Sequence, residues 1–217
     1  MAVVIPALSA ATALPRTLAA IGPGITVIVV DGGSTDATPA VAAAAGAAVI
    51  AAPRGRGSQL AAGIAASDAP WLLLLHADTR LGPGWRAAVA AHQRDDADRA
   101  GYFHLALDSF RPAARRLERI VAWRCRVLAL PYGDQGLLIS RALLDAAGGM
   151  RALPLMEDVD LVLRLGRRRL APLSATATTS AARYERGGYL RRSARNLACL
   201  ALWFLGVPPR LIARLYG

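Results

Sequence analysis

The stretch WLLLLHADTR (residues 71–80) joins a continuous apolar run to a short polar end. The apolar run, 71–75, is too short for a typical helix, and it is typical of a strand buried on both faces of a parallel sheet. It stops at His76 and Asp78, so a carboxylate follows a buried strand. Ligands of α/β proteins bind at the edge formed by the carboxyl ends of the parallel strands. Asp78 therefore predicts a binding site at that edge.

The first half of the chain alternates strand-like and helix-like segments. Apolar runs of strand type occupy 3–5, 26–30, 48–50 and 71–76, and Ala-rich helical windows lie at about 11–20, 38–45, 58–66 and 84–92. Thr38-Pro39 is typical of a helix start, with a capping residue followed by proline. Right-handed crossovers place the carboxyl ends of such strands on one edge. We therefore expect an α/β fold with a mostly parallel central sheet flanked by helices.

The second half has longer and more amphipathic segments. The pattern predicts a strand at 101–108, an Arg-rich helix at 112–129, a short strand at 136–140 before a helix ending at Gly148-Gly149, a helix at 157–168, and two C-terminal helices in 189–216 broken at Pro208-Pro209. No repeat or flexible linker interrupts the chain. We expect one domain over 1–217, with a nucleotide-binding half (1–110) and an acceptor half (111–217) that carries the C-terminal helices.

Charge is distributed unevenly. The net charge is +11, yet residues 1–110 carry 7 Arg and 8 Asp, whereas residues 111–217 carry 19 Arg and 7 acids. GC-rich coding explains the preference for Arg over Lys but not this asymmetry. The second half is thus suited to an anionic partner, which leaves a phosphorylated ligand, an acidic membrane and nucleic acid as candidates.

The compartment follows from what the chain lacks. No apolar run approaches the roughly 18 residues of a membrane span, and the start, MAVVIPAL, has no basic region before its apolar residues, so it predicts a strand and not a signal peptide. Cys125 and Cys199 are far apart and form no metal-binding pattern. We expect buried, reduced thiols in a cytoplasmic protein.

VVDGGSTD (29–36) ends the second strand with an aspartate and two glycines. Glycine lets a ligand approach the backbone, and Asp31 at the strand end can accept hydrogen bonds from a base or a ribose. The alternative is a tight turn in which Ser34, Thr35 and Asp36 cap the next helix. We favour the ligand role for Asp31 and the capping role for Asp36.

PRGRGSQLAAG (53–63) places Arg54 and Arg56 in a glycine-rich turn before a helix. Backbone amides, a helix start and guanidinium groups suit a diphosphate. The segment nearly contains G-x-G-x-x-G, but position 60 is leucine, and the turn follows the third strand instead of the first. A dinucleotide-binding motif is therefore rejected.

Acidic residues supply the remaining candidates. Asp78 can hold Mg²⁺ or Mn²⁺, ions that commonly take one or two protein carboxylates and complete their shell with water and phosphate oxygens. His76 can contact a ribose or serve as a second ligand, although we favour a hydrogen-bonded histidine at a strand end. In PLMEDVDL (154–161), Glu157 and Asp158 are adjacent and must point in different directions. One can act as a general base while the other caps the helix or forms an ion pair.

Taken in order, these motifs resemble family-2 glycosyltransferases of the GT-A fold. Within that family the chain looks most like a small bacterial subfamily named transferase 2, rSAM/selenodomain-associated, some members of which are linked to arsenosugar synthesis. The segments that carry the resemblance span nearly the whole chain: VVDGGSTD, PRGRGSQ, LHADTRL, PYGDQGLLISR, PLMEDVDL and GVPPRLIARLYG. Each segment alone is weak evidence for the family, but all six in this order are specific to it.

The resemblance implies inverting transfer of a sugar from a nucleoside-diphosphate sugar to an acceptor hydroxyl, with Mg²⁺ or Mn²⁺ as cofactor. It implies that Asp158 is the base and that Asp78, the last acid of the family's D-x-D motif, binds the metal. The implied donor-binding residues are Pro6, Asp31, Gly32, Arg54, Gly55, Arg56, His76 and Asp78. The implied sugar or acceptor pocket contains Gly133, Asp134, Gln135 and Glu157, and the candidates for gripping the diphosphate are Arg183, Arg191 and Arg192.

The chain departs from the family pattern at three places. Ser9-Ala10 stands where Asn-Glu is common, Ala61 replaces a usual asparagine, and His76 replaces the first acid of D-x-D, which looks like a feature of the subfamily. The first two changes put the donor contacts in doubt.

Two other function classes were weighed. A nucleotidyltransferase would need a glycine-rich, basic loop after the first strand, where this chain has IPALSAAT. A non-catalytic module would use the basic half on nucleic acid or membrane. No basic patch interleaved with aromatic residues is present, so we expect no nucleic-acid partner. Peripheral contact with the inner face of a membrane through the basic half is compatible with the enzyme.

Overall fold

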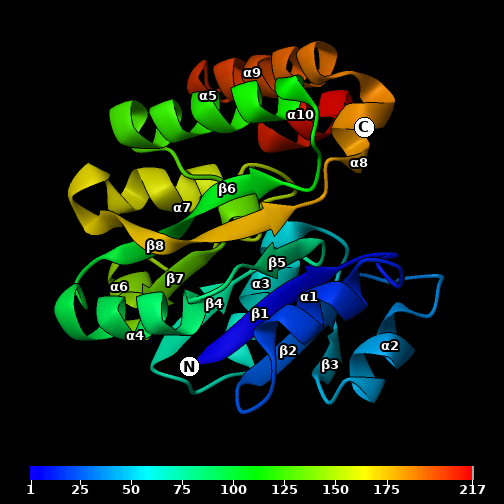
Figure 1. Cartoon of the computed structure of the whole chain (residues 1–217), viewed down its shortest axis with the longest axis vertical. Helices are drawn as coiled ribbons and strands as arrows, with labels where there is room; N and C mark the ends of the chain where they lie inside the picture. Colours follow the sequence, from blue (N-terminus) through cyan, green and yellow to red (C-terminus); the bar gives the residue numbers. More distant parts are fainter. Residues whose placement is uncertain (217) are drawn as a thin grey trace.

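The computed structural model describes residues 1–216. Within these residues, eight strands form one sheet in the order β3-β2-β1-β4-β7-β6-β8-β5, and helices cover both of its faces (Figure 1). The predicted α/β class is confirmed.

The N-terminal half forms the parallel part of the sheet. Its strands are β1 (Ala2–Ala7), β2 (Thr26–Asp31), β3 (Ala48–Ala51) and β4 (Trp71–Leu74), and they are linked through α1 (Leu14–Ile21), α2 (Thr38–Ala44) and α3 (Arg56–Ala65). Ala7 pairs with Asp31, and Asp31 pairs with Ala51. This register aligns the carboxyl ends of three strands on one edge, as the sequence predicts. Before α2, the Thr38 N–H donates to the Asp36 carboxylate at 3.0 Å, so Asp36 closes the turn that leads into the helix, while the N-cap position is Ala37 and carries no side-chain cap.

The second half of the sheet is mixed. It contains β5 (Thr79–Leu81), β6 (Ala100–Leu107), β7 (Leu137–Ser140) and β8 (Leu170–Thr179), with α4 (Trp85–Asp95), α5 (Pro112–Leu128), the short 3-10 helix η1 (Gly133–Gln135), α6 (Arg141–Ala146), α7 (Glu157–Leu165) and a second 3-10 helix, η2 (Arg167–Arg169). β7 runs antiparallel to β4 and to β6, whereas β6 and β8 are parallel. The sequence analysis missed β5 and β8, and the predicted strand at 71–76 ends at Leu74.

Alternating residues of the strands build two cores. Val4 of β1 packs with α3, α5, α6 and α7 on one face of the sheet, while Val3 and Ile5 pack with α1 and α4 on the other. Strands buried on both faces need apolar residues at consecutive positions, which explains the uninterrupted runs in β1, β2 and β4.

The C-terminal helices lie with α5 at one end of the molecule (Figure 1). They are α8 (Ala182–Gly187), which was not predicted, α9 (Tyr189–Phe204) and α10 (Pro209–Tyr216), and the predicted break at Pro208-Pro209 is confirmed. Cys199 and Ile212 pack on Met156 and Val159, at the start of α7. The C-terminal helices therefore support the segment that carries Glu157 and Asp158.

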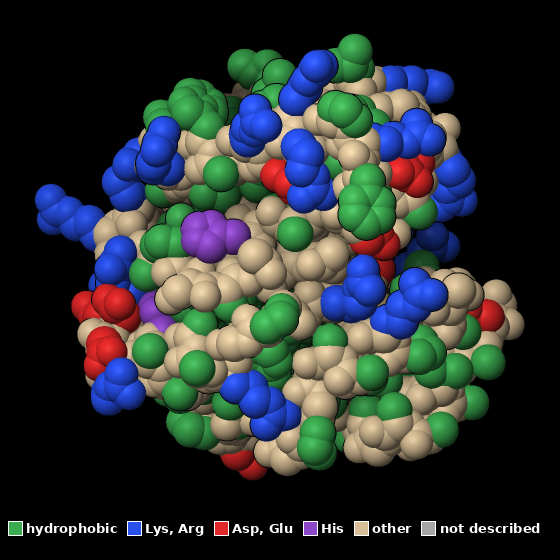
Figure 2. Space-filling model, in the orientation of Figure 1, with side chains coloured by type: hydrophobic (Ala, Val, Ile, Leu, Met, Phe, Trp, Pro, Cys, Tyr) green, Lys and Arg blue, Asp and Glu red, His purple; other side chains and the backbone are tan. Residues whose placement is uncertain are grey.

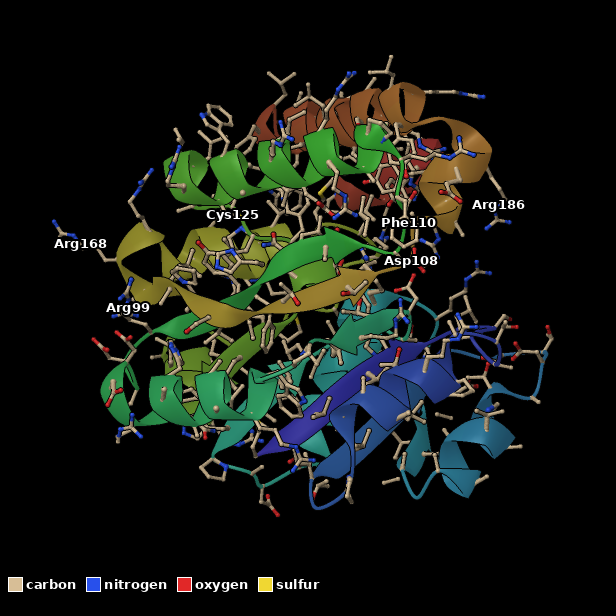
Figure 3. The ribbon with its side chains drawn as sticks, viewed as in Figure 1. Arg99, Asp108, Phe110, Cys125, Arg168 and Arg186 are labelled. Atoms are coloured by element: carbon tan, nitrogen blue, oxygen red, sulfur yellow. The ribbon has the colours of Figure 1, made fainter. Side chains whose placement is uncertain are left out.

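Both cysteines are free and buried, and Cys125 points from α5 toward the sheet (Figure 3). Among the helices of residues 1–216, none combines the length and the apolar character needed to cross a membrane.

Candidate active site

The edge of the parallel strands begins with Asp31, which holds its own turn. Its carboxylate is largely buried and accepts hydrogen bonds from the N–H groups of Gly33 (3.1 Å) and Ser34 (3.0 Å) and from the Ser34 hydroxyl. The turn is therefore formed before any ligand arrives. Pro6 is buried within β1 beside Val30, next to this edge.

Gln59 is a residue that the sequence analysis passed over. Its Nε2 atom donates to the carbonyls of Ala7 (2.8 Å) and Val30 (2.7 Å), so one buried amide joins the ends of β1 and β2. Gly32 packs directly on it, because a Cβ atom at Gly32 would lie 3.0 Å from the Gln59 side chain. The only signal in the sequence is a single amide side chain within an Ala-rich helix.

The glycine-rich turn presents its two arginines differently. Arg54 is exposed, whereas Arg56 is half-buried and forms an ion pair with Glu157, with 2.8 Å between Nε and Oε1. Gly55 has φ 141°, a backbone conformation that favours glycine. A Cβ atom at Gly57 would lie 2.5 Å from the Leu153 carbonyl oxygen, so the turn is docked on the loop before α7.

Glu157 is buried, with only 1% of its surface exposed. Burial raises the pKa of its carboxyl to about 7, although the Arg56 charge opposes this shift. Its Oε2 atom has no hydrogen-bond partner among the described residues 1–216. Glu157 is thus the member of the acidic pair that forms the ion pair.

His76 and Asp78 occupy the turn after β4 and are both half-buried. Burial, and then the Arg56 charge, lower the pKa of His76 to about 4, against the opposing effect of Asp78. The imidazole is therefore neutral near pH 7, and its Nε2 atom lies 3.4 Å from Nη1 of Arg56. The favoured interpretation, a hydrogen-bonded histidine at a strand end, agrees with this contact.

The GDQG segment forms η1 and faces the acidic pair. The Gly133 N–H donates to Oδ2 of Asp158 at 2.7 Å. Burial raises the pKa of Asp134 to about 6, and its Oδ1 atom has no hydrogen-bond partner within residues 1–216. Asp78 and Asp158 both add to this rise in pKa, so Asp134 lies within the same charged cluster.

Gln135 does not line this pocket, and that prediction is wrong. Its side chain is buried, with Nε2 donating to the Phe103 carbonyl at 2.9 Å and Oε1 accepting from the Tyr132 N–H at 3.2 Å. Gln135 therefore fixes η1 against β6 and contributes to the fold instead of contacting a ligand.

Asp158 is half-buried and Glu157 is buried, and both line the same pocket. Met156 precedes the pair with φ 66°, and Oδ1 of Asp158 accepts from the Val159 N–H at 2.8 Å. The pocket beside Asp158 has a mixed lining of polar groups and apolar side chains. Its lining residues include His76, Gly133, Glu157 and Asp158, with Leu60, Leu75, Pro131, Tyr132, Met150 and Leu161.

The three arginines predicted for the diphosphate fall in different places. The charge of Arg183 contributes to lowering the pKa of His76, which places Arg183 near the site. Arg192 donates to the Tyr216 hydroxyl at 3.3 Å and lies over the Tyr184 ring. Arg191 is exposed on α9, and because neighbouring residues of a helix point about 100° apart it does not share the direction of Arg192. Its role toward the diphosphate stays a prediction.

Arg124 is a second residue that the sequence analysis missed. Its guanidinium carbon lies 3.4 Å from the centre of the Tyr132 ring, and its charge opposes the rise in the pKa of Asp134. It approaches the site from α5, whose sequence indicates only an amphipathic helix.

The side chains that could ligate a metal fit a weakly bound divalent ion. Asp78 offers a carboxylate beside a neutral imidazole, and Asp134 offers a buried oxygen without a partner. Within residues 1–216, no group of three or more His, Cys, Asp or Glu residues is arranged as a complete metal site. Such a set suits Mg²⁺ or Mn²⁺ whose shell is completed by phosphate oxygens and water.

Comparison with known proteins gives the family. The model of glycosyl transferase family 2 matches residues 2–153. The chain belongs to this family. The match ends before Glu157 and Asp158, so the roles of those two residues rest on geometry.

The curated relatives carry the same assignment. Uncharacterized glycosyltransferases of Mycobacterium bovis and Mycobacterium tuberculosis are 40% identical over 97 residues, which is 44% of this chain and 44% of each relative. The matched region therefore spans less than half of those proteins.

Solved structures show the GT-A fold. Staphylococcus aureus TarS 1-349, in complex with UDP-GlcNAc, has a TM-score of 0.65 at 16% identity, covering 82% of this chain and 58% of that chain. Glucosyl-3-phosphoglycerate synthase of M. tuberculosis, in complex with Mn²⁺, UDP and glucosyl-3-phosphoglycerate, has a TM-score of 0.58 at 21% identity, covering 95% and 80%. At these identities the likeness shows the fold alone. Family and fold together make the chain a glycosyltransferase domain.

Proposed function

We propose that the domain transfers a sugar, with inversion, from a nucleoside-diphosphate sugar to an acceptor hydroxyl, and that Asp158 is the base. One observation carries this proposal: both acids line the pocket, but Glu157 is buried in an ion pair with Arg56, whereas Asp158 is only half-buried. A base must reach the hydroxyl proton within hydrogen-bond distance, and Asp158 is the more accessible member of the pair.

The donor would bind along the edge of the parallel strands. Asp31 and Gly32 would contact the base or ribose, with Pro6 beside them. Arg54, Gly55 and Arg56 would approach the diphosphate from the glycine-rich turn, and His76 would contact the donor as a neutral imidazole. Because Asp31 and Gly32 are held in place by the turn and by Gln59, this part of the site needs little ordering on binding.

The leaving diphosphate would be met by positive charge. Asp78 would hold Mg²⁺ or Mn²⁺, which would supply charge neutralisation to the phosphate oxygens, and Arg183 and Arg192 would add to it from the C-terminal half. Gly133, Asp134 and Glu157 would shape the pocket on the acceptor side. In-line displacement requires a base on one side of the sugar and charge stabilisation on the other, and the second half of the chain would contribute to both.

The identities of donor and acceptor form the finer part of the proposal. UDP or UDP-GlcNAc is bound in the TarS structures, and UDP with Mn²⁺ in the synthase, so uridine nucleotides are the first donors to test. The motifs resemble those of the subfamily linked to arsenosugar synthesis, and we propose that the chain belongs to it. We also propose a cytoplasmic site of action with peripheral contact to a membrane.

A thermal-shift screen of UDP-, GDP- and TDP-sugars with Mn²⁺ tests donor binding, because a ligand that binds only the folded state raises the melting temperature. Asp78→Asn should abolish the Mn²⁺-dependent part of this shift, and calorimetry with and without EDTA should agree. Binding that is unchanged in both assays would remove the metal role.

Asp158→Asn should leave donor binding intact and stop transfer. Retained turnover would remove Asp158 as the base. Release of pyrophosphate from a nucleoside triphosphate, with no affinity for nucleotide sugars, would instead indicate a nucleotidyltransferase.

A further inference from the structure

The outer face of α9 is apolar and unpartnered. Leu190, Leu197 and Phe204 are spaced by seven residues, so they lie on one line along the helix, and they are 88%, 66% and 57% exposed. Ala194 and Ala201 fall between them and are also exposed. The opposite face of α9 is buried in the fold through Cys199 and Leu200. The outer line is therefore not needed to hold the helix in place.

Helix α5 extends this surface. Ile120, Trp123 and Val127 are exposed at helical spacing, while Val121 and Cys125 on the opposite face enter the core. The two helices contact each other and lie side by side at one end of the molecule (Figure 1). We call the exposed surface formed by Ile120, Trp123, Val127, Leu190, Leu197 and Phe204 the α5–α9 face.

The charge around this face has one sign. The three helices α5, α9 and α10 carry arginines at 115, 116, 119, 124, 126, 191, 192, 195, 210 and 214, against the single acid Glu118. Glu118 is largely buried and is paired with Arg115 at 2.9 Å. Figure 2 shows arginine side chains scattered among hydrophobic ones over this end of the molecule. Apolar and cationic groups are therefore mixed, with almost no negative charge to offset them.

This combination selects one kind of occupant. A second copy of the chain would bring its own arginines against these, and like charges oppose such an interface. Nucleic acid would pair with the arginines but would leave the apolar line of α9 against phosphates. A membrane with anionic lipids satisfies both, because acyl chains accept the leucine and aromatic side chains while headgroups meet the arginines.

We propose that the α5–α9 face docks the enzyme on membrane surfaces that contain anionic lipids. The helices lie on the surface and do not span it, in agreement with the absence of a membrane-crossing helix in residues 1–216. The inner face of α9 packs on Met156 and Val159, which flank the acidic pair, so the pocket would sit about one helix diameter, roughly 10 Å, from the lipid. The inference does not depend on the proposed transfer reaction.

Partition onto vesicles tests the proposal. The full chain should bind equimolar phosphatidylcholine–phosphatidylglycerol vesicles in a flotation assay, and phosphatidylcholine vesicles much more weakly. Leu197→Gln with Phe204→Gln should weaken binding at least roughly tenfold, since two large apolar side chains leave the lipid. Arg116→Gln with Arg119→Gln should weaken it by roughly fivefold for each arginine that meets the headgroups, and added salt should reduce the difference.

Controls come from exposed residues outside the face. Leu163 lies exposed on α7, and Arg168, the middle residue of η2, extends away from α5 and α9 (Figure 3). Leu163→Gln and Arg168→Gln should leave vesicle binding unchanged. Each variant should keep the wild-type melting temperature within a few degrees, which separates loss of docking from loss of fold.

Three results would overturn the proposal. The wild-type chain fails to bind anionic vesicles at low salt, or the Leu197→Gln, Phe204→Gln variant binds them as well as the wild type does. Alternatively, light scattering reveals a dimer that this double variant abolishes, in which case the face belongs to a second copy.

Discussion

Arg56 Nε lies 2.8 Å from Glu157 Oε1, and this ion pair joins the glycine-rich turn to the start of α7. The turn belongs to the first half of the chain (1–110), and the helix to the second half (111–217). The same arginine reaches His76 with Nη1 at 3.4 Å. One buried carboxylate therefore positions a guanidinium group beside His76, in the turn that also carries Asp78, and it leaves Asp158 as the more accessible carboxylate of the pocket.

Glu157→Gln should loosen both the fold and the donor site. The substitution keeps the shape of the side chain but leaves Arg56 without its opposite charge. Removing one partner of a buried pair costs about 3–5 kcal/mol, but burial already disfavours the charged Glu157 carboxylate and Arg56 is 34% exposed, so we expect a loss of at most about 1 kcal/mol in the free energy of unfolding near pH 7. Urea denaturation measures this loss, and calorimetric titration with UDP and Mn²⁺ should show weaker binding.

Asp160→Asn is the matched control for Glu157→Gln. Asp160 lies on the same helix, is also buried, and is paired with Arg151 at 2.9 Å and with Arg164 at 2.8 Å. Asp160→Asn should lose at least as much stability as Glu157→Gln while binding UDP normally. If both variants lose nucleotide affinity to the same extent, the effect is general loosening and Arg56 has no specific role.

The stability of the wild-type chain should carry a pH signature of Glu157. Its pKa is raised from 4.5 to about 7, so between these values the folded chain holds a proton that the unfolded chain has lost. Linkage then makes the contribution of this group to the free energy of unfolding fall as pH rises, by at most about 1.4 kcal/mol per pH unit. The contribution is present below about pH 4.5 and is lost as pH approaches 7.

Urea denaturation at several pH values between 5 and 8 measures this signature. The difference between wild type and Glu157→Gln isolates it, because every other titrating group is shared. As pH rises to about 7, the free energy of unfolding of the wild type should fall relative to that of the variant. Above about pH 7 the two curves should run parallel. Parallel curves across the whole range would show that the Glu157 carboxyl titrates normally.

The parallel half of the fold was predictable from sequence because its strands are buried on both faces. Runs such as VVI and TVIVV stand out against Ala-rich helices. Strand β8 was missed although its residues alternate, with Leu173, Ala175 and Ala177 inward. Alanine and proline have weak strand propensity, so the period of two is faint in LAPLSATATT. Strand β5 has only three residues, which is too few for any pattern.

Site residues could be predicted from sequence where their own chemistry defines the role, and could not where the role depends on contacts with residues distant in the sequence. Asp31 and Asp78 are predicted from carboxylates at the ends of strands, whereas the choice of Asp158 over Glu157 rests on the family resemblance. Gln59 bonds two backbone carbonyls whose positions depend on sheet register, and no local pattern encodes that. Within GDQG, Gly133 lines the pocket whereas Gln135 faces the core, because a 3-10 turn points successive side chains in different directions.

Gly133→Ala should damage the site more than the fold. A Cβ atom there would lie 2.6 Å from His76 Nε2 and 3.2 Å from Asp158 Oδ2, so both side chains must move. Misplacement of catalytic groups by about 1 Å can cost on the order of a hundredfold in rate, whereas we expect a loss of about 1 kcal/mol in stability. Steady-state transfer, once a donor is found, and urea denaturation measure the two effects.

Gly63→Ala is the control, because its Cβ atom would collide with Val4 and Val30 in the core. This variant should lose about 1–3 kcal/mol in the free energy of unfolding, while its folded fraction keeps the wild-type kcat/KM. Normal kcat/KM in Gly133→Ala would mean that the contact between η1, His76 and Asp158 does not set the geometry of the reaction.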